Sequence, residues 1–168
     1  MNLFGVLSEV YPTLLTGLTM TVKITILSLI IALVIGIFVC LMNISSNIVL
    51  RGIAKFYIWL IRGTPMLVQA FYFYFALPQL VQAVTGSQFR ITVFTASLVT
   101  LALNAGAYIS EIFRGSIESV NKGQMEAARS LGLSYAKSMQ KIILPQAVRI
   151  CLPSLVNQFI ICLLYTSP

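Results

Sequence analysis

The sequence LLTGLTMTVKITILSLIIALVIGIFVCLM, residues 14–42, decides the fold class. Lys23 is its one charged residue. A helix needs about 20 mostly apolar residues to cross the hydrocarbon core of a bilayer, and this run is longer. We therefore predict a membrane-spanning helix from Leu14 to Met42, entered at Tyr11-Pro12 and left at Asn43–Asn47. Lys23 lies near its start, where the side chain can reach the interface, so we interpret it as an anchor rather than a ligand.

The composition extends this interpretation to the whole chain. Of the 168 residues, 58% are apolar and 9% are charged, whereas soluble domains carry about 25% charged residues. The net charge of +7 raises the alternative of a nucleic-acid partner. However, the basic residues stand between long apolar runs, and membrane proteins gather Lys and Arg in their cytoplasmic loops. We predict an integral membrane protein surrounded by the lipid bilayer, and no nucleic-acid partner.

A second apolar run, Tyr57–Leu77, is interrupted by Arg62-Gly63-Thr64-Pro65. We expect a short interfacial helix around Trp59, followed by one span. Thr64 is the expected N-cap of that span, because a threonine followed by proline is typical of a helix start. Pro78 is expected to kink or end the span.

Two more apolar runs follow along the chain. Ile91–Phe113 predicts a third span, whereas Ile150–Leu164 is short for a crossing. Either this last run does not cross, or the chain is cut inside it. The polar stretch Arg114–Arg149 lies between the two runs and is long enough to hold structure of its own.

The basic residues between the spans indicate the orientation of the chain. They fall nine against one on alternate sides of the membrane. The nine are Arg51, Lys55, Arg62, Arg114, Lys122, Arg129, Lys137, Lys141 and Arg149, and the one is Arg90. Because cytoplasmic loops carry the excess of Lys and Arg, we predict an outward N-terminus and a cytoplasmic 114–149 loop. The predicted fold is all-α: a polytopic helical bundle with a helical cytoplasmic loop.

The cytoplasmic loop contains signals for two short helices. Gln124–Leu131 is rich in helix formers. Gly132 follows at a position that suits the left-handed conformation of a helix C-terminus. Ser134 is a candidate N-cap for the second helix, and Pro145 is expected to end or kink it.

The second helix is expected to be amphipathic, because its residues sort into two stripes at helical spacing. One stripe is apolar: Leu133, Ala136, Met139 and Ile143. The other is polar: Ser134, Lys137, Ser138 and Lys141. An ordinary pair of interfacial helices would carry the same pattern. The small alanines of the first helix point instead to close contact with another surface.

The spacing of this loop resembles a known motif. Glu126-Ala127-Ala128, three residues, Gly132, nine residues, Ile142, one residue and Leu144-Pro145 match the EAA loop of permeases of ATP-binding-cassette importers. Four other segments resemble those of the polar amino acid permeases within that group. These segments are Arg62–Gln69, Tyr108–Gly115, Lys122–Gln124 and Leu144–Ala147.

This resemblance implies the function and the partners. The chain is expected to be the permease subunit of an importer that moves polar amino acids across the bacterial inner membrane. It implies a cytoplasmic ATPase dimer that binds the ATP, an extracytoplasmic amino acid-binding protein and a second permease subunit, identical or paralogous. The helix around Glu126–Leu131 is expected to dock in a groove of the ATPase, whose closure on ATP moves the permease helices.

The resemblance also assigns roles in the first loop helix. Ala127 and Ala128 are expected to form the close-packed docking surface. Glu126 anchors that surface by its charge or caps backbone donors at the helix start. Gly132 makes the turn between the two helices.

Three residues of the second loop helix complete the assignment. Ile142 and Leu144 are expected to seat that helix, and Pro145 sets its exit. Together with the first helix they define a coupling loop over residues 114–149, within one permease domain covering 1–168.

The sequence departs from the family pattern at three places. Asn121 replaces a usual proline, and Ser116 replaces a usual glycine. Relatives continue from the region of Asn157-Gln158-Phe159 into a fifth span, whereas this sequence stops at Pro168. We therefore interpret the domain as truncated at its C-terminus relative to the family.

Polar residues within the spans are candidates for the substrate path. Glu111 either belongs to that path or forms a salt bridge with Arg114, three residues on. Asn104 and Gln69 either line the path or form hydrogen bonds between helices.

Two other functions compete with the permease assignment. An ion-coupled secondary transporter would need internal repeats and ionisable residues near the midplane, and neither is visible. A structural membrane subunit would have no reason to carry the EAA spacing. The chain lacks a G-x-x-x-x-G-K-[ST] loop, His and Asp, so we expect no catalytic residues, no metal site and no cofactor bound directly.

Overall fold

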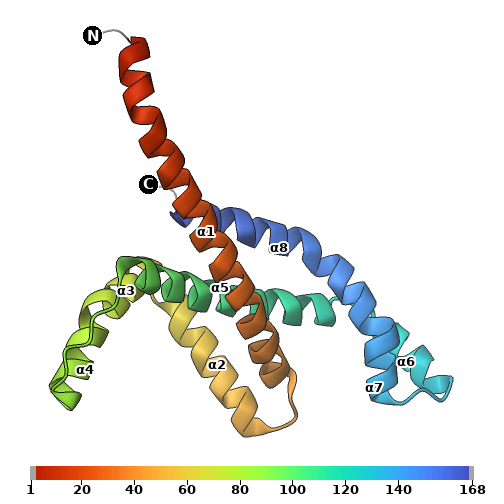
Figure 1. Ribbon diagram of the computed structural model, residues 1–168. Helices are drawn as coiled ribbons and strands as arrows, with labels where there is room; N and C mark the ends of the chain where they lie inside the picture. The colour runs from red at the N-terminus through yellow and green to blue at the C-terminus, as the bar shows by residue number, and fades with distance from the viewer. Residues whose placement is uncertain (1–2, 167–168) are drawn as a thin grey trace.

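The computed structural model describes residues 3–166, with side chains from 10 to 165, and every regular element in this range is helical (Figure 1). The α-helices are α1 (Leu3–Ile44), α2 (Ile48–Gly63), α3 (Met66–Phe71), α4 (Leu77–Thr85), α5 (Val93–Glu118), α6 (Lys122–Ser130), α7 (Tyr135–Ser138) and α8 (Leu144–Thr166). Two π-helical turns, η1 (Tyr72–Ala76) and η2 (Met139–Ile143), connect α3 to α4 and α7 to α8. Within the described range, four helical segments are long and apolar enough to cross a membrane: Val10–Ile44, Met66–Thr85, Val93–Glu118 and Tyr135–Tyr165. The prediction of an all-α transmembrane bundle is confirmed.

The first helix is longer than expected. It begins at Leu3 and passes through Pro12, which we had placed at its entry. Proline removes one backbone hydrogen bond, but leaving the helix inside an apolar stretch would expose many more unpaired groups. At 1.5 Å per residue, α1 is roughly 60 Å long, about twice the hydrocarbon thickness. Its N-terminal end stands clear of the other helices (Figure 1).

The centre of the fold is the crossing of α1 and α5. A β-carbon placed on Gly36 would lie 2.5 Å from Ile109 Cγ2, and one placed on Gly106 would lie 2.8 Å from Ile35 Cγ2. Each glycine therefore receives an isoleucine of the facing helix, and no larger residue fits without movement. Ala32, Ala105, Ile109 and Cys162 form a fully buried cluster at the same place, which brings α8 into the crossing.

Polar side chains at this crossing are satisfied within their own helices. Ser28 Oγ donates to the Thr25 carbonyl at 3.0 Å, and Ser110 Oγ donates to the Ala107 carbonyl at 2.8 Å. Because these hydroxyls bond to the backbone of their own helix, the two serines present only a small, uncharged side chain to the neighbouring helix. Such residues allow α1 and α5 to approach closely in an apolar medium.

The two helices run in the same direction. Ile35 contacts Gly106 and Gly36 contacts Ile109, so residue numbers increase in the same direction along α1 and α5. Near the far end, Asn43 Nδ2 donates to Glu111 Oε1 at 3.3 Å. The segment that follows α1 and the segment that follows α5 therefore emerge at the same end of the bundle. This agrees with the charge count, which placed Arg51 and Arg114 on one side.

The second apolar run is divided differently from our expectation. The helix α2 ends at Gly63 with Thr64 as its C-cap, and Pro65 is the N-cap of α3. Thr64 is therefore not an N-cap: its Oγ1 donates backward to the Leu60 carbonyl at 2.9 Å. The helix that precedes this break is α2, with 16 residues longer than the short interfacial helix expected around Trp59, and the candidate span begins at Met66.

Two prolines lie inside helical segments where we expected kinks or ends. Pro78 and Pro145 each follow a π-helical turn and a leucine, at η1–Leu77 and η2–Leu144. A proline ring clashes with the carbonyl four residues back. The wider π-turn moves that carbonyl away, because it shifts the hydrogen bonds to five-residue spacing. The helix thus continues through both prolines.

Because the helix continues through Pro145, our expectation for the fourth apolar run was wrong. We judged Ile150–Leu164 short for a crossing, but the helix α8 begins at Leu144 and has 23 residues. With α7 and η2 the candidate span covers Tyr135–Tyr165. By length and composition this segment is sufficient to cross a membrane.

The glycine contacts give a direct test of the fold. We expect Gly36→Val to lower the melting temperature, because its side chain meets Ile109 and overpacking typically costs about 1–3 kcal/mol. The readout is a thiol-reactive dye, since Cys40, Cys151 and Cys162 are all buried and react only on unfolding. Gly17→Val is the matched control on the same helix, because nothing lies within 4 Å of a β-carbon there. Equal melting temperatures for the two variants would contradict the proposed packing.

Candidate functional site

The first loop helix, α6, is fixed at both ends by its own sequence. Asn121 is the N-cap, and its side-chain oxygen accepts a hydrogen bond from the Gly123 N–H at 2.8 Å. At the C-terminus, Gly132 adopts φ +84°. The Gly132 N–H donates to the Arg129 carbonyl at 3.0 Å and the Leu133 N–H to the Ala128 carbonyl at 3.2 Å. This pair of bonds is a Schellman motif, which confirms the predicted glycine turn.

The second loop helix begins as expected. Ser134 is the N-cap of α7, and its Oγ accepts from the Lys137 N–H at 3.4 Å. The predicted stripes are wrong at two positions: Ser138 is fully buried, and Ala136 is exposed. The Ser138 hydroxyl donates to the Ser134 carbonyl at 3.0 Å, so it is buried without an unpaired donor.

A small apolar cluster holds the loop against the end of α5. Its buried members are Val120, Ile143 and Ala147, with Met125 and Met139 packed against them. Ile142 is partly buried against this cluster, whereas Leu144 is 38% exposed and lies outside it, in a pocket lined by α1 and α5. Ile143, which we had placed only in the apolar stripe, is instead the buried residue that packs the second loop helix against Val120.

The two alanines of α6 differ in exposure. Ala128 is buried, 2% exposed, against its own chain, whereas Ala127 and Glu126 are exposed. The exposed surface of α6 continues to Leu131, which is 84% exposed. The capping role expected of Glu126 is wrong, because α6 begins at Lys122 and Asn121 supplies the cap. Sequence reasoning included Leu131 in the docking helix but gave it no role of its own, although its four-residue spacing from Ala127 places both on one helix face.

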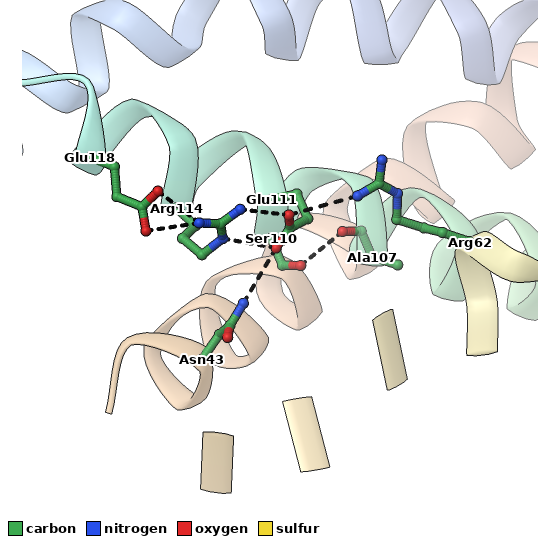
Figure 2. A network of polar contacts seen from close by, with 7 residues as sticks. All are labelled: Asn43, Arg62, Ala107, Ser110, Glu111, Arg114 and Glu118. Carbon is green, nitrogen blue, oxygen red and sulfur yellow. Dashed lines mark hydrogen bonds and ion pairs between the residues drawn. The ribbon is translucent and has the colours of Figure 1, made fainter. Parts of the chain in front are cut away.

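A polar network lies where α1, α2 and α5 meet (Figure 2). Glu111 is its centre: Arg114 Nε donates to Oε1 at 3.0 Å and Nη2 to Oε2 at 2.9 Å. Arg114 Nη1 also holds both oxygens of Glu118, at 2.8 and 2.7 Å. Asn43 from α1 and Arg62 from α2 approach the same Glu111 carboxylate, at 3.3 and 3.7 Å. The salt bridge with Arg114 that we considered for Glu111 is therefore present.

Gln69 and Asn104 join three elements. Gln69 Nε2 donates to the Ile61 carbonyl at 2.7 Å and to Thr64 Oγ1 at 2.8 Å, across the break between α2 and α3. Asn104 Nδ2 donates to Gln69 Oε1 at 3.3 Å. Hydrogen bonds between helices, one of the two alternatives for this pair, are thus observed.

A pocket of about 490 Å³ lies beside this pair. Its polar lining comprises Arg62, Thr64, Asn104, Tyr108, Gln158 and Tyr165. Arg62 lies 4.9 Å above the Tyr108 ring, in a cation–π contact. Of the three candidate path residues, only Asn104 lines this pocket. Gln69 is buried behind Asn104, and Glu111 reaches the pocket only through Arg62.

Comparison with known proteins decides the family. Residues 32–167 match the family described as the inner membrane component of binding-protein-dependent transport systems. The chain belongs to this family of permeases.

Two relatives and one solved structure are similar over most of the permease chain. The arginine transport system permease protein of Bacillus subtilis strain 168 is 44% identical over 89% of this chain and 65% of its own length. The glutamine transport system permease protein of Escherichia coli strain K12 is 42% identical over 93% and 69%. The crystal structure of an amino acid ABC transporter with histidines is 40% identical, with a TM-score of 0.90, covering 99% of this chain and 74% of that one. The chain thus spans about two thirds of the length of these permeases.

The turn in the coupling loop of this permease is open to experiment. We expect Gly132→Val to open the loop, because a β-branched residue at φ +84° costs roughly 1–2 kcal/mol or more. Trypsin should then cleave after Arg129 several-fold faster in nanodiscs.

Gly132→Asn is the matched control, because asparagine adopts the left-handed conformation more readily. Its cleavage rate should stay close to wild type. If valine and asparagine give the same rate, the positive φ does not hold the loop.

Proposed function

We propose that this chain is a permease subunit of an ATP-driven importer of polar amino acids in the bacterial inner membrane. The observation that carries the proposal is the exposed surface Glu126–Ala127–Leu131, held rigidly at the end of α5. An exposed leucine on a capped, anchored helix outside the spans suits a protein partner rather than the interior of the bundle. The family and the names of the relatives support a transport system.

The energy source in this proposal is a separate cytoplasmic ATPase dimer. It would contact the exposed face of α6, while the buried face, with Ala128 and Met125, transmits the movement to α8 through η2. The other proposed partners are an extracytoplasmic amino acid-binding protein and a second permease subunit. ATP would bind to the ATPase and not to this chain.

The proposed substrate path runs past Asn104. A free amino acid carries one carboxylate and one ammonium group, so its passage needs donors and acceptors together. The pocket offers the cation of Arg62 and the amides of Asn104 and Gln158. Gln69 would position Asn104, and Glu111 would position Arg62.

Leu131 tests the coupling surface without disturbing the fold. We expect Leu131→Asp to weaken association with the ATPase at least 10-fold and to abolish substrate-stimulated ATP hydrolysis, because a buried unpaired charge at an interface costs about 2–5 kcal/mol. Expression should be unchanged, because the side chain is 84% exposed. The measurement is co-purification with the ATPase and stimulated hydrolysis in nanodiscs. Ser46→Asp, in the exposed loop at the same end of the bundle, is the control; full coupling in Leu131→Asp would refute the docking surface.

The proposed orientation places the N-terminus outside and α6 in the cytoplasm. Single cysteines replace Thr13 and Ser134, both exposed, in a chain lacking the three native cysteines. A membrane-impermeant thiol reagent on intact cells should label the Thr13→Cys variant only. Labelling of Ser134→Cys alone would reverse the topology.

A further inference from the structure

A second pocket opens at the end of the bundle where α1, α2 and α5 meet. It measures about 640 Å³ and is lined among others by Asn43, Ile44, Arg51, Lys55 and Trp59. Ile44 is the last residue of α1, and Arg51 and Lys55 belong to the first two turns of α2. The pocket also reaches Glu118, the last residue of α5. Since all three helices have their termini here, the pocket lies at the level expected for lipid headgroups.

The pocket carries positive charge that its own carboxylates do not neutralise. Glu111 and Glu118 line it, and a single Arg114 holds both at 2.7–3.0 Å, so the three cations Arg51, Lys55 and Arg114 exceed the two carboxylates by one positive charge. Arg51 and Lys55 form no ion pair with any side chain of residues 10–165. Arg51 and Lys55 lie one helical turn apart, and neighbouring Arg114 is already paired with the two carboxylates. The two unpaired cations therefore make the pocket a site for an anion.

Ile58 and Trp59 line the pocket from α2, and an apolar, aromatic strip of the same helix lies beside them. On α2, Val49, Ile53 and Phe56 are exposed on the face away from the bundle, and Trp59 is 69% exposed. The Phe56 and Trp59 ring centroids are 6.0 Å apart. A helix with a basic edge, an apolar face and tryptophan is typical of the membrane interface. An anion held here would carry apolar chains, because the strip beside the pocket continues into the surface that faces lipid.

We propose that this pocket binds the headgroup of an anionic phospholipid. Its phosphate would lie between the Arg51 guanidinium and the Lys55 ammonium, and its acyl chain along Trp59 and Phe56. Basic pockets between transmembrane helices bind anionic headgroups in this way. The site is distinct from the Asn104 pocket, which lies on the other side of Arg62.

Trp59 provides an internal reporter, because it is the sole tryptophan of the 168-residue chain. The chain is placed in nanodiscs of phosphatidylcholine and phosphatidylglycerol, with bromine near the headgroup end of one acyl chain of either lipid. At equal mole fraction, brominated phosphatidylglycerol should quench Trp59 fluorescence more strongly. The enrichment expected is roughly fivefold for each of the two basic side chains.

The double variant Arg51→Gln, Lys55→Gln should reduce this quenching to the level given by brominated phosphatidylcholine. Quenching by brominated phosphatidylcholine itself should be unchanged, which shows that α2 still lies in the membrane. Lys137→Gln, Lys141→Gln is the matched control, because both residues are exposed and have the same spacing. The proposal is overturned if the two brominated lipids quench equally. It is also overturned if quenching survives the first double variant or falls equally in the second, since attraction would then be diffuse.

Discussion

The close approach of α1 and α5 is the constraint on which the rest of this structure depends. Two isoleucines, Ile109 and Ile35, pack against two glycines, Gly36 and Gly106, so only one side chain separates the backbones at each contact. In a bilayer there is little hydrophobic gain from joining two apolar helices, and van der Waals contact at small residues takes its place. Once the crossing is fixed, α2 and α8 have defined places. The Tyr57 hydroxyl of α2 donates to the Leu103 carbonyl at 2.6 Å, and Cys162 of α8 enters the buried cluster.

The polar features of the permease are arranged around this crossing. Because α1 and α5 run in the same direction, Asn43 reaches Glu111, and the arginines of α2 and α5 meet the same carboxylate. The coupling loop continues from that end of α5 and is packed by Ile143 and Ala147 back onto Val120. A displacement of α6 is thereby connected through η2 to α8, whose Cys162 contacts the crossing. The path from the proposed docking surface to the polar pocket is a continuous chain of packed helices.

The helical class and the Gly132 turn could be predicted from the sequence, because the first rests on composition and the second on one residue's backbone preference. The N-cap predicted at Thr64 was wrong, because the residue instead ends α2 and turns its hydroxyl back to Leu60. At Pro78 and Pro145 we expected a kink or an end, and the end is wrong, because a π-turn before each proline lets the helix continue. The burial of Ala128 against its own chain was also missed. A motif gives the spacing of residues, but which face of α6 is buried is decided by Met125 and Val120 of the same chain. Glu111 and Gln69 left two alternatives open, and only three-dimensional contacts from Asn43, Arg62 and Thr64 could show what they bind.

The crossing itself is tested most directly by a double-mutant cycle of Gly36→Val and Ile109→Ala, measured as melting temperatures in detergent. Each single change should destabilise the chain, the first by overpacking and the second by leaving a cavity that typically costs about 2–5 kcal/mol. If the two side chains meet as the structure shows, the cavity accepts the added valine. We then expect the double variant to be more stable than the sum of the two losses, by about 0.5–3 kcal/mol. Strictly additive losses would contradict the account, because Gly36 and Ile109 would then not be in contact.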